Sequence, residues 1–298
     1  MFRWIFPLLV ACCLAPCPAF AGQPLNVVAS FSILGDMVKN VGGDRISLTV
    51  LVGPNSDTHV FQPKPADAKT LAGADVVFVN GLGFEGWMTR LVRASGYKGP
   101  VVEASQGVKT LTMADEEHGG KKVADPHAWQ DLANGKRYVA TIEKALSQAD
   151  PAGAEVYTAN AQAYLKKIEA MDAWVKAEFA KVPQEERRII TSHDAFGYLG
   201  HAYGVTLLAP MGFSTESEAS ALNVGKLIRQ IKKEKIKALF VENMSDPRMI
   251  ERIAKEAGVR PGGTLYSDAL SEPDGPGGTY LDMFRNNVTK LVAAMTAS

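Results

Sequence analysis

The sequence predicts an α/β protein made of two (β/α) lobes with parallel sheets, joined by one long helix. Three observations support this fold class. Short apolar strands alternate with helix-like stretches, two parts of the chain repeat the same order of elements, and an uninterrupted helical pattern separates the two parts. The strands are continuous apolar runs rather than alternating ones, which is typical of parallel sheets covered on both faces.

The two copies match element by element. The first is expected to contain a strand at 27–30, a helix ending near Gly42, a strand at 47–52, a helix at 65–72, a strand at 76–80, a helix at 84–95 and a strand at 100–103. The second is expected to contain a strand at 189–192, a helix ending near Gly204, a strand at 206–209, a helix at 222–234, a strand at 238–243, a helix at 247–257 and a strand at 264–267. Such a repeat predicts two lobes of the same design.

A long helix is expected between the copies, over residues 150–181. Apolar or small residues recur there at helical spacing, and neither Gly nor Pro follows Gly153. About 28 helical residues would span roughly 42 Å, enough to run along both lobes. A coiled-coil segment is the alternative, but the apolar positions keep no sustained heptad. We therefore expect lobes at 22–149 and 183–298, with a connecting helix at 150–182.

The first 21 residues resemble a cleavable signal peptide. Arg3 supplies a positive start, residues 4–14 are largely apolar, and Ala19-Phe20-Ala21 has the form of a cleavage site. A membrane anchor is disfavoured because prolines interrupt a stretch shorter than the roughly 20 residues that a spanning helix needs. We therefore expect a secreted, periplasmic protein and exclude residues 1–21 from the fold.

All three cysteines lie inside that segment: Cys12, Cys13 and Cys17. The mature chain would then have neither disulfides nor thiolate metal ligands. Leu9-Val10-Ala11-Cys12 resembles a lipoprotein processing box, but the apolar run before Cys12 is short, so a lipid anchor is the less favoured alternative.

The charge pattern argues against a nucleic-acid partner. The 32 Lys and Arg residues are scattered among 32 Asp and Glu residues, and they form no basic patch of the kind that phosphate neutralisation requires.

Four side chains are expected at the carboxyl ends of strands, where open parallel sheets place their ligands. His59 follows the strand that ends near residue 52, and His193 follows the strand that begins at 189. His127 is expected in the first turn of a helix capped by Asp125, and Asp268 follows the last strand. A capping or core role is the alternative for each of them alone. Together, three imidazoles and one carboxylate suit a borderline divalent ion and would close a tetrahedral zinc site.

These positions also carry a family resemblance, which covers essentially the whole mature chain. The segments that carry it, together with the signal segment, are Asp57-Thr58-His59 with Pro63, Asp125-Pro126-His127-Ala128-Trp129, Ser192-His193-Asp194-Ala195-Phe196-Gly197-Tyr198 and Tyr266-Ser267-Asp268. They resemble the zinc and manganese solute-binding proteins of ABC importers. The resemblance implies a metal held in the cleft between the lobes by His59, His127, His193 and Asp268, and delivery to an ABC permease in the inner membrane.

One position separates the subgroups of this family. Members that resemble manganese or iron binders have Glu where this chain has His193, so the extra imidazole favours zinc, with manganese as the alternative. Many zinc-binding members carry a His-rich loop, whereas residues 113–124 contain only His118. We expect His118 to be a solvated loop residue and His201 to be structural. Glu242, at the end of its strand, is a candidate for supporting a metal ligand.

A secreted zinc hydrolase is the rival from another class, because three protein ligands and a water form the catalytic arrangement. Asp268 disfavours it, since a fourth protein ligand leaves no open position. The expected protein is therefore a monomeric carrier rather than an enzyme, and a metallochaperone is left open as a second partner.

Overall fold

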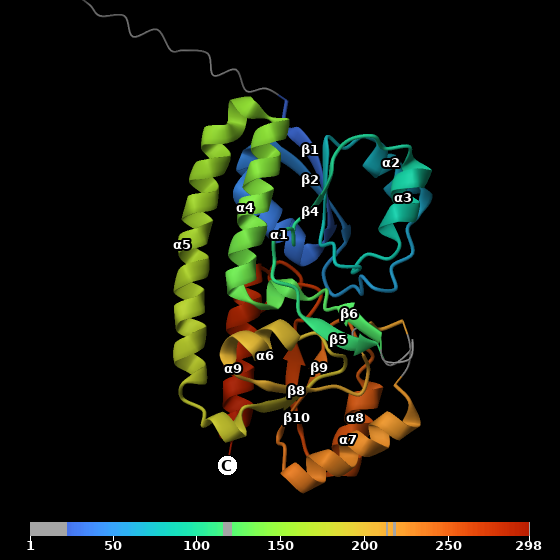
Figure 1. Ribbon diagram of the computed structural model, residues 1–298, viewed down its shortest axis with the longest axis vertical. Coiled ribbons are helices and arrows are strands. Elements are labelled where there is room, and N and C mark those ends of the chain that lie inside the picture. The colour runs from blue at the N-terminus through green and yellow to red at the C-terminus, as the bar shows by residue number, and fades with distance from the viewer. Residues whose placement is uncertain (1–22, 116–120, 213, 217–218, 298) are drawn as a thin grey trace, which may run out of the picture.

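The computed structural model describes residues 23–115, 121–212, 214–216 and 219–297. It confirms the predicted class, because two parallel four-stranded sheets lie at opposite ends of the molecule, with a long helix beside both (Figure 1). The expected signal peptide at 1–21 and His118 lie outside the described residues. None of the helices in the described part is long and apolar enough to cross a membrane.

The first sheet has the strand order β2-β1-β3-β4, with all neighbours parallel. Its strands are β1 (Leu25–Phe31), β2 (Ile46–Val52), β3 (Val76–Val79) and β4 (Val101–Glu103). Its helices are α1 (Ser32–Gly42), α2 (Pro65–Ala72) and α3 (Met88–Ser95). The central strands are buried on both faces, which explains their continuous apolar sequences.

The second sheet has the order β10-β9-β7-β8 and is also parallel. Its strands are β7 (Arg188–Ile190), β8 (Thr206–Leu208), β9 (Ala238–Glu242) and β10 (Pro261–Leu265), and its helices are α6 (Gly197–Tyr203), α7 (Ala221–Glu234) and α8 (Arg248–Ala257). In both sheets the first strand of the copy lies between the second and the third. The predicted repeat is therefore a repeat of topology, and each sheet has a switch point at its first strand.

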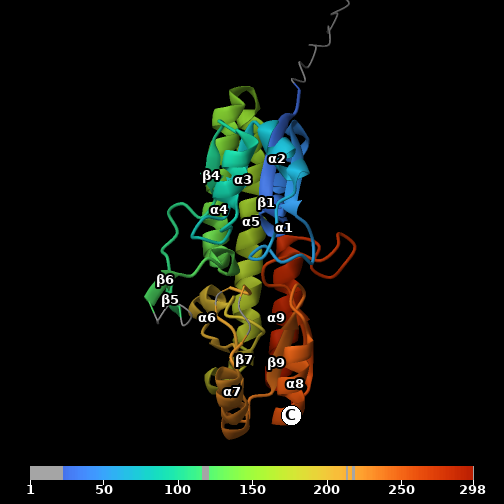
Figure 2. The ribbon, with the colours of Figure 1, turned by 90° about the vertical axis from the view of Figure 1, so that its right-hand side faces the viewer.

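The connecting helix is α5 (Ala154–Phe179), which has 26 residues and follows a short 3-10 turn, η3 (Pro151–Gly153). At 1.5 Å per residue it is about 39 Å long. It packs against α1 in the first lobe and against α6 in the second, and Figure 2 shows it running along both lobes. Arg285 stacks on Trp174 of α5 at 4.7 Å, which adds a contact to the second lobe.

Several elements were not predicted from the sequence. These are the helix α9 (Tyr280–Thr296), the antiparallel hairpin of β5 (Thr112–Asp115) and β6 (Lys121–Ala124), and the 3-10 turns η1 (Gly43–Arg45), η2 (Ala128–Gln130) and η4 (Gln184–Glu186). The helix α4 (Leu132–Ala149) was expected only at its start, near His127. Both long helices pack on α5, and α9 also packs on α1 and on β10, so it bridges the lobes.

The helix expected at 84–95 begins later, at Met88. The reason is local. Glu85 is buried, and its carboxylate accepts hydrogen bonds from the backbone N–H groups of Asn80 (2.6 Å) and Gly81 (3.3 Å) and from the hydroxyl of Ser30 (2.6 Å). These bonds hold the chain in a turn where a helix would otherwise start.

Candidate metal centre

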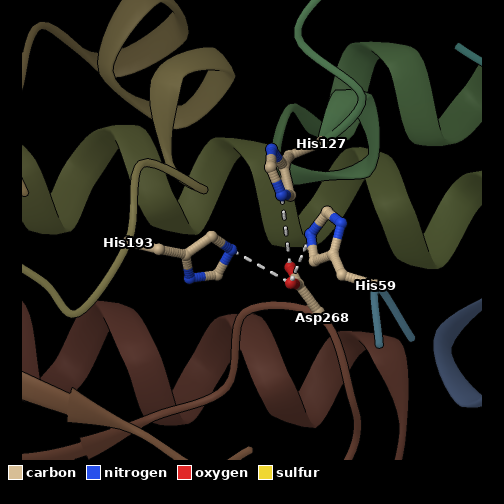
Figure 3. A group of neighbouring side chains, drawn as sticks. All are labelled: His59, His127, His193 and Asp268. Carbon is tan, nitrogen blue, oxygen red and sulfur yellow. Dashed lines mark ion pairs between the residues drawn. The ribbon is translucent and has the colours of Figure 1, made fainter. Parts of the chain in front are cut away.

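The structure brings His59, His127, His193 and Asp268 together. One nitrogen from each imidazole and one carboxylate oxygen all lie within 4.8 Å of one another. Asp268 is the centre of the group, and Figure 3 shows the three rings pointing at its carboxylate. Its Oδ2 lies 3.1 Å from Nε2 of His193 and 3.3 Å from Nε2 of His59, and its Oδ1 lies 3.6 Å from Nε2 of His127. All four side chains are buried.

His59 and His127 come from loops of the first lobe, and a carboxylate two residues earlier shapes each loop. Asp57 accepts a hydrogen bond from the backbone N–H of His59 at 2.9 Å. Asp125 Oδ1 lies 2.9 Å from both the backbone N and the Nδ1 of His127. Asp125 therefore leaves Nε2 of His127 free to face the site.

The expected helix start at His127 needs a correction. Asp125 and Pro126 do not begin an α-helix, because His127 comes just before the 3-10 turn η2 (Ala128–Gln130), and α4 begins only after Asp131. The carboxylate of Asp125 bonds to His127 itself rather than capping a longer helix. The imidazole is still held at the start of a short 3-10 turn.

His193 comes from the loop after β7 and is held within the second lobe. Its backbone carbonyl accepts a hydrogen bond from the hydroxyl of Thr191 at 2.9 Å, and its backbone N–H donates to Glu242 Oε1 at 2.9 Å. Its ring contacts the same carboxylate, since Nδ1 lies 2.6 Å from Oε2, an ion pair in which the N–H is not aligned on the oxygen. Glu242 therefore lies beside the site, as the sequence suggested.

Asp268 follows β10 of the second sheet, yet its loop is fastened to the first lobe. The carbonyl of Ser267 accepts hydrogen bonds from Trp129 Nε1 (2.9 Å) and Gln130 Nε2 (2.8 Å). The N–H of Leu270 donates to the hydroxyl of Ser32 at 2.9 Å. The donor group is thus assembled from four loops, and the loop of Asp268 belongs to both lobes.

The free atoms of the group fit a cation. Nε2 of all three histidines and both oxygens of Asp268 are buried without a hydrogen-bond partner among the residues that the structure describes. Buried polar atoms are normally satisfied, so five unsatisfied atoms around one point are a strong indication of an absent ligand. Nitrogen and carboxylate donors without sulfur match a borderline divalent metal.

Comparison with known proteins decides the family. The family model described as zinc-uptake complex component A, periplasmic, matches residues 27–294. The chain belongs to this family. Members of the zinc-uptake component family are metal-binding receptors of ABC transporters rather than enzymes, and they act with ABC permease components.

Individual relatives agree with this assignment. The chain is 34% identical over 275 residues to the manganese-binding lipoprotein MntA of Halalkalibacterium halodurans, covering 92% of this chain and 90% of the relative. It is 32% identical over 294 residues to the manganese ABC transporter substrate-binding lipoprotein PsaA of Streptococcus pneumoniae, covering 97% and 94%. A solved structure, the manganese-bound periplasmic metal binding protein from Candidatus Liberibacter asiaticus, is similar with a TM-score of 0.81 at 32% identity, covering 91% and 99%.

The electrostatics of this member of the family differ from one histidine to the next. Burial alone would lower the pKa of His193, but the carboxylates of Glu242 and Asp268 outweigh it and raise that pKa well above its usual value. Burial lowers the pKa of His59. Burial alone would raise the pKa of Asp268, but His193 and His127 hold it well below its usual range. Asp268 is therefore ionised, as a metal ligand must be.

Four further residues were either singled out or overlooked in the sequence. His201 is exposed on α6 and does not join the group, and its structural role stays a prediction. Trp129, Gln130 and Ser267 were missed as contributors. The first and last of them stand inside the quoted motifs, but their bonds join segments 137 or 138 residues apart, which no local pattern reveals.

Proposed function

We propose that this chain captures one divalent transition-metal ion, zinc before manganese, in the periplasm and delivers it to an ABC permease. In this proposal His59, His127, His193 and Asp268 are the ligands. The observation that carries the proposal is the convergence of three unpartnered Nε2 atoms on the buried carboxylate of Asp268. Such a donor group has little use in a protein core without a cation, because burying unpaired polar atoms is costly.

The choice of zinc rests on the donors of this chain. Three imidazoles and one carboxylate are softer than a set with two carboxylates, and the third imidazole is His193. The names of the relatives above point to manganese instead, so manganese is the alternative cargo. The family assignment supports a metal carrier in either case.

The number of donors also separates a metal carrier from the rival class, a secreted zinc hydrolase. A catalytic zinc needs three protein ligands and an open position for water, whereas four protein donors close a tetrahedron. In the proposed site each imidazole has its Nε2 near Asp268, so the carboxylate belongs to the coordination group rather than serving as a distant base. This arrangement favours binding and release over hydrolysis.

The proposal includes secretion through the segment at 1–21. Two relatives described above are named lipoproteins, which gives a lipid anchor on a cysteine of that segment more support than the sequence alone gave it. Mass spectrometry of the membrane-associated and soluble forms distinguishes a lipid-modified Cys12 from a chain cleaved after Ala21. We further propose that the carrier acts as a monomer with one permease, and a metallochaperone stays open as a second partner.

The function is tested by metal affinity. Zinc and manganese dissociation constants are measured by competition with a chromophoric chelator for the wild type, His127→Ala, Asp268→Ala and the control His201→Ala. We expect tight zinc binding with one ion per chain in the wild type and in His201→Ala, and a loss of at least about 100-fold in the other two.

Two results would contradict the proposal. Zinc binding that survives both His127→Ala and Asp268→Ala would place the metal elsewhere. A wild type that binds manganese more tightly than zinc would leave the carrier role intact and overturn the choice of cargo.

A further inference from the structure

Glu242 joins the two metal-facing loops of the second lobe. It ends β9, is 1% exposed, and lies between the loop of His193 and the loop of Asp268. Its Oε1 accepts from the backbone N–H of His193 at 2.9 Å, and its Oε2 accepts from the hydroxyl of Ser267 at 2.6 Å. The same Oε2 lies 2.6 Å from Nδ1 of His193. One buried carboxylate thus contacts a candidate ligand and the neighbour of another.

One contact of Glu242, the ion pair between its Oε2 and Nδ1 of His193, depends on an imidazole at position 193. A histidine there presents Nε2 to the metal while Nδ1 faces this carboxylate. A glutamate at 193 has no donor to offer. It would place a second carboxylate beside that of Glu242, with the carboxylate of Asp268 only 3.1 Å from the present Nε2. Two carboxylates so close together repel each other, so a glutamate at 193 would exchange the present ion pair with Glu242 for a repulsion.

We propose that Glu242 is a positioning residue that sets the metal preference of the site. Its carboxylate fixes the backbone and ring of His193, and it suits an imidazole but not a carboxylate at that position. The inference rests on the proposed function, because it takes His193 as a ligand. It implies that this chain cannot be converted into a carboxylate-rich, manganese-preferring site by changing position 193 alone.

The experiment compares Glu242→Gln, Glu242→Ala, His193→Glu and the double variant His193→Glu/Glu242→Gln, with Glu272→Gln as a matched control on an exposed glutamate. Zinc and manganese affinities are measured for each. We expect zinc binding to weaken about 10-fold in Glu242→Gln and about 100-fold in Glu242→Ala, in the range of other changes behind metal-bound histidines. Glu272→Gln should match the wild type.

The swap at 193 gives the sharper outcome. His193→Glu alone should lose zinc without gaining manganese, and the double variant should bind manganese at least about 10-fold more tightly than His193→Glu. Equal manganese affinity in these two variants would overturn the proposal. So would zinc affinity in Glu242→Gln and Glu242→Ala equal to that of the wild type.

A spectroscopic measurement separates positioning from general support of the fold. The ¹⁵N signals of the imidazoles are recorded in the metal-free protein, and Glu242→Gln should move those of His193 while leaving those of His201 in place. Unchanged His193 signals would contradict the proposal. Because Gln keeps the size of Glu, this variant carries the test if Glu242→Ala fails to fold. A wild type that binds no metal would refute the proposed function. The ¹⁵N comparison is made without metal, so it tests the role of Glu242 separately.

Discussion

The three histidines of the candidate metal centre stand in unlike surroundings, although all point at one carboxylate. His193 lies between two carboxylates, Glu242 and Asp268, whereas the position of His59 is dominated by burial. The pKa of His193 is consequently raised and that of His59 is lowered. In the metal-free protein at neutral pH, His193 therefore holds the proton that an incoming metal must displace.

This leads to a prediction for the pH dependence of binding. Because the pKa of His193 is raised, zinc affinity should increase with pH through the neutral range, by up to about tenfold per pH unit for one displaced proton. Zinc titrations from pH 5 to pH 9 measure this directly, and calorimetry in two buffers of different ionisation enthalpy counts the released protons. An affinity that stays constant between pH 5 and pH 8 would contradict the assignment of His193 as a ligand.

Glu85 gives a second prediction, this one on stability. Its pKa is raised by burial to about 7, from a usual value of 4.5. Because the folded protein holds this proton more tightly than the unfolded chain, the associated stability is full below pH 4.5 and is lost as the pH rises through 7. The loss is at most about 3 kcal/mol. Glu85→Gln should therefore gain stability relative to the wild type between pH 5 and pH 8, as measured by urea unfolding.

The comparison of variants isolates this effect, because every other titrating group is shared. A difference between Glu85→Gln and wild type that is the same at pH 5 and pH 8 would show that the carboxyl has an ordinary pKa in the folded protein.

At the residue scale, the sequence singled out the four side chains that the structure brings together, and their role as metal ligands stays a prediction. Strand ends in parallel sheets are fixed by short-range apolar patterns, so His59, His193 and Asp268 could be placed without knowing how the lobes meet. The partners of these residues could not be predicted. Trp129 and Gln130 reach Ser267 only because the two lobes pack together, and that packing is not encoded in any local pattern.

Among the elements, the loop after β10 has the most influence on the site. It belongs to the chain of the second sheet, but Trp129, Gln130 and Ser32 of the first lobe hold its backbone. The hydroxyl of Tyr280, at the start of α9, also donates to the carbonyl of Trp129 at 2.5 Å. The short turn η2 and the β10 loop therefore form one hydrogen-bonded unit around Asp268.

Removing one bond from this unit should weaken metal binding. Trp129→Phe keeps an aromatic ring but loses the N–H that donates to Ser267, so we expect zinc affinity to fall about 10-fold. Trp174→Phe is the matched control, because it makes the same change on α5, at the stack with Arg285. Both variants should lower the melting temperature, but only Trp129→Phe should change the zinc dissociation constant. Equal zinc affinities in the two variants would contradict this role.

The helices and the hairpin that lie outside the two matched copies were predicted least well. Both α4 and α9 carry a regular buried stripe, at 138, 139, 142 and 146 and at 280, 283, 284, 287, 288 and 291, so their helical periodicity was available in the sequence. Their caps were visible in principle, since Asp131 accepts from the N–H of Ala133, and Thr279 from that of Asp282. The strands β5 and β6 pair only with each other and are short, so their sequences show no extended apolar pattern.

For the whole molecule, the long helix sets the range of motion. Because α5 packs on helices of both lobes, a wide rotation of one lobe would break contacts along its length. We expect small-angle X-ray scattering to give nearly the same radius of gyration with and without zinc, and hydrogen exchange to localise the change to the loops after β2, β7 and β10. A clear expansion on removal of zinc would refute this expectation.

The division into units at 22–149, 150–182 and 183–298 stays a prediction. The sheets follow it, but α9 lies in the last range and packs against α1 and α5 as well as β10. The apolar core accordingly continues from one lobe to the other, and only a smaller cluster under α7 and α8 belongs to the second lobe alone.

The loop of Asp268 is fastened to both lobes, so it couples them at the candidate metal centre. The carbonyl of Ser267 accepts from Trp129 and Gln130 of the first lobe, and its hydroxyl donates to Glu242 of the second. Any separation of the lobes would therefore load these bonds first. The order in which they break would decide whether Asp268 stays with the histidines of the first lobe or with the histidine of the second.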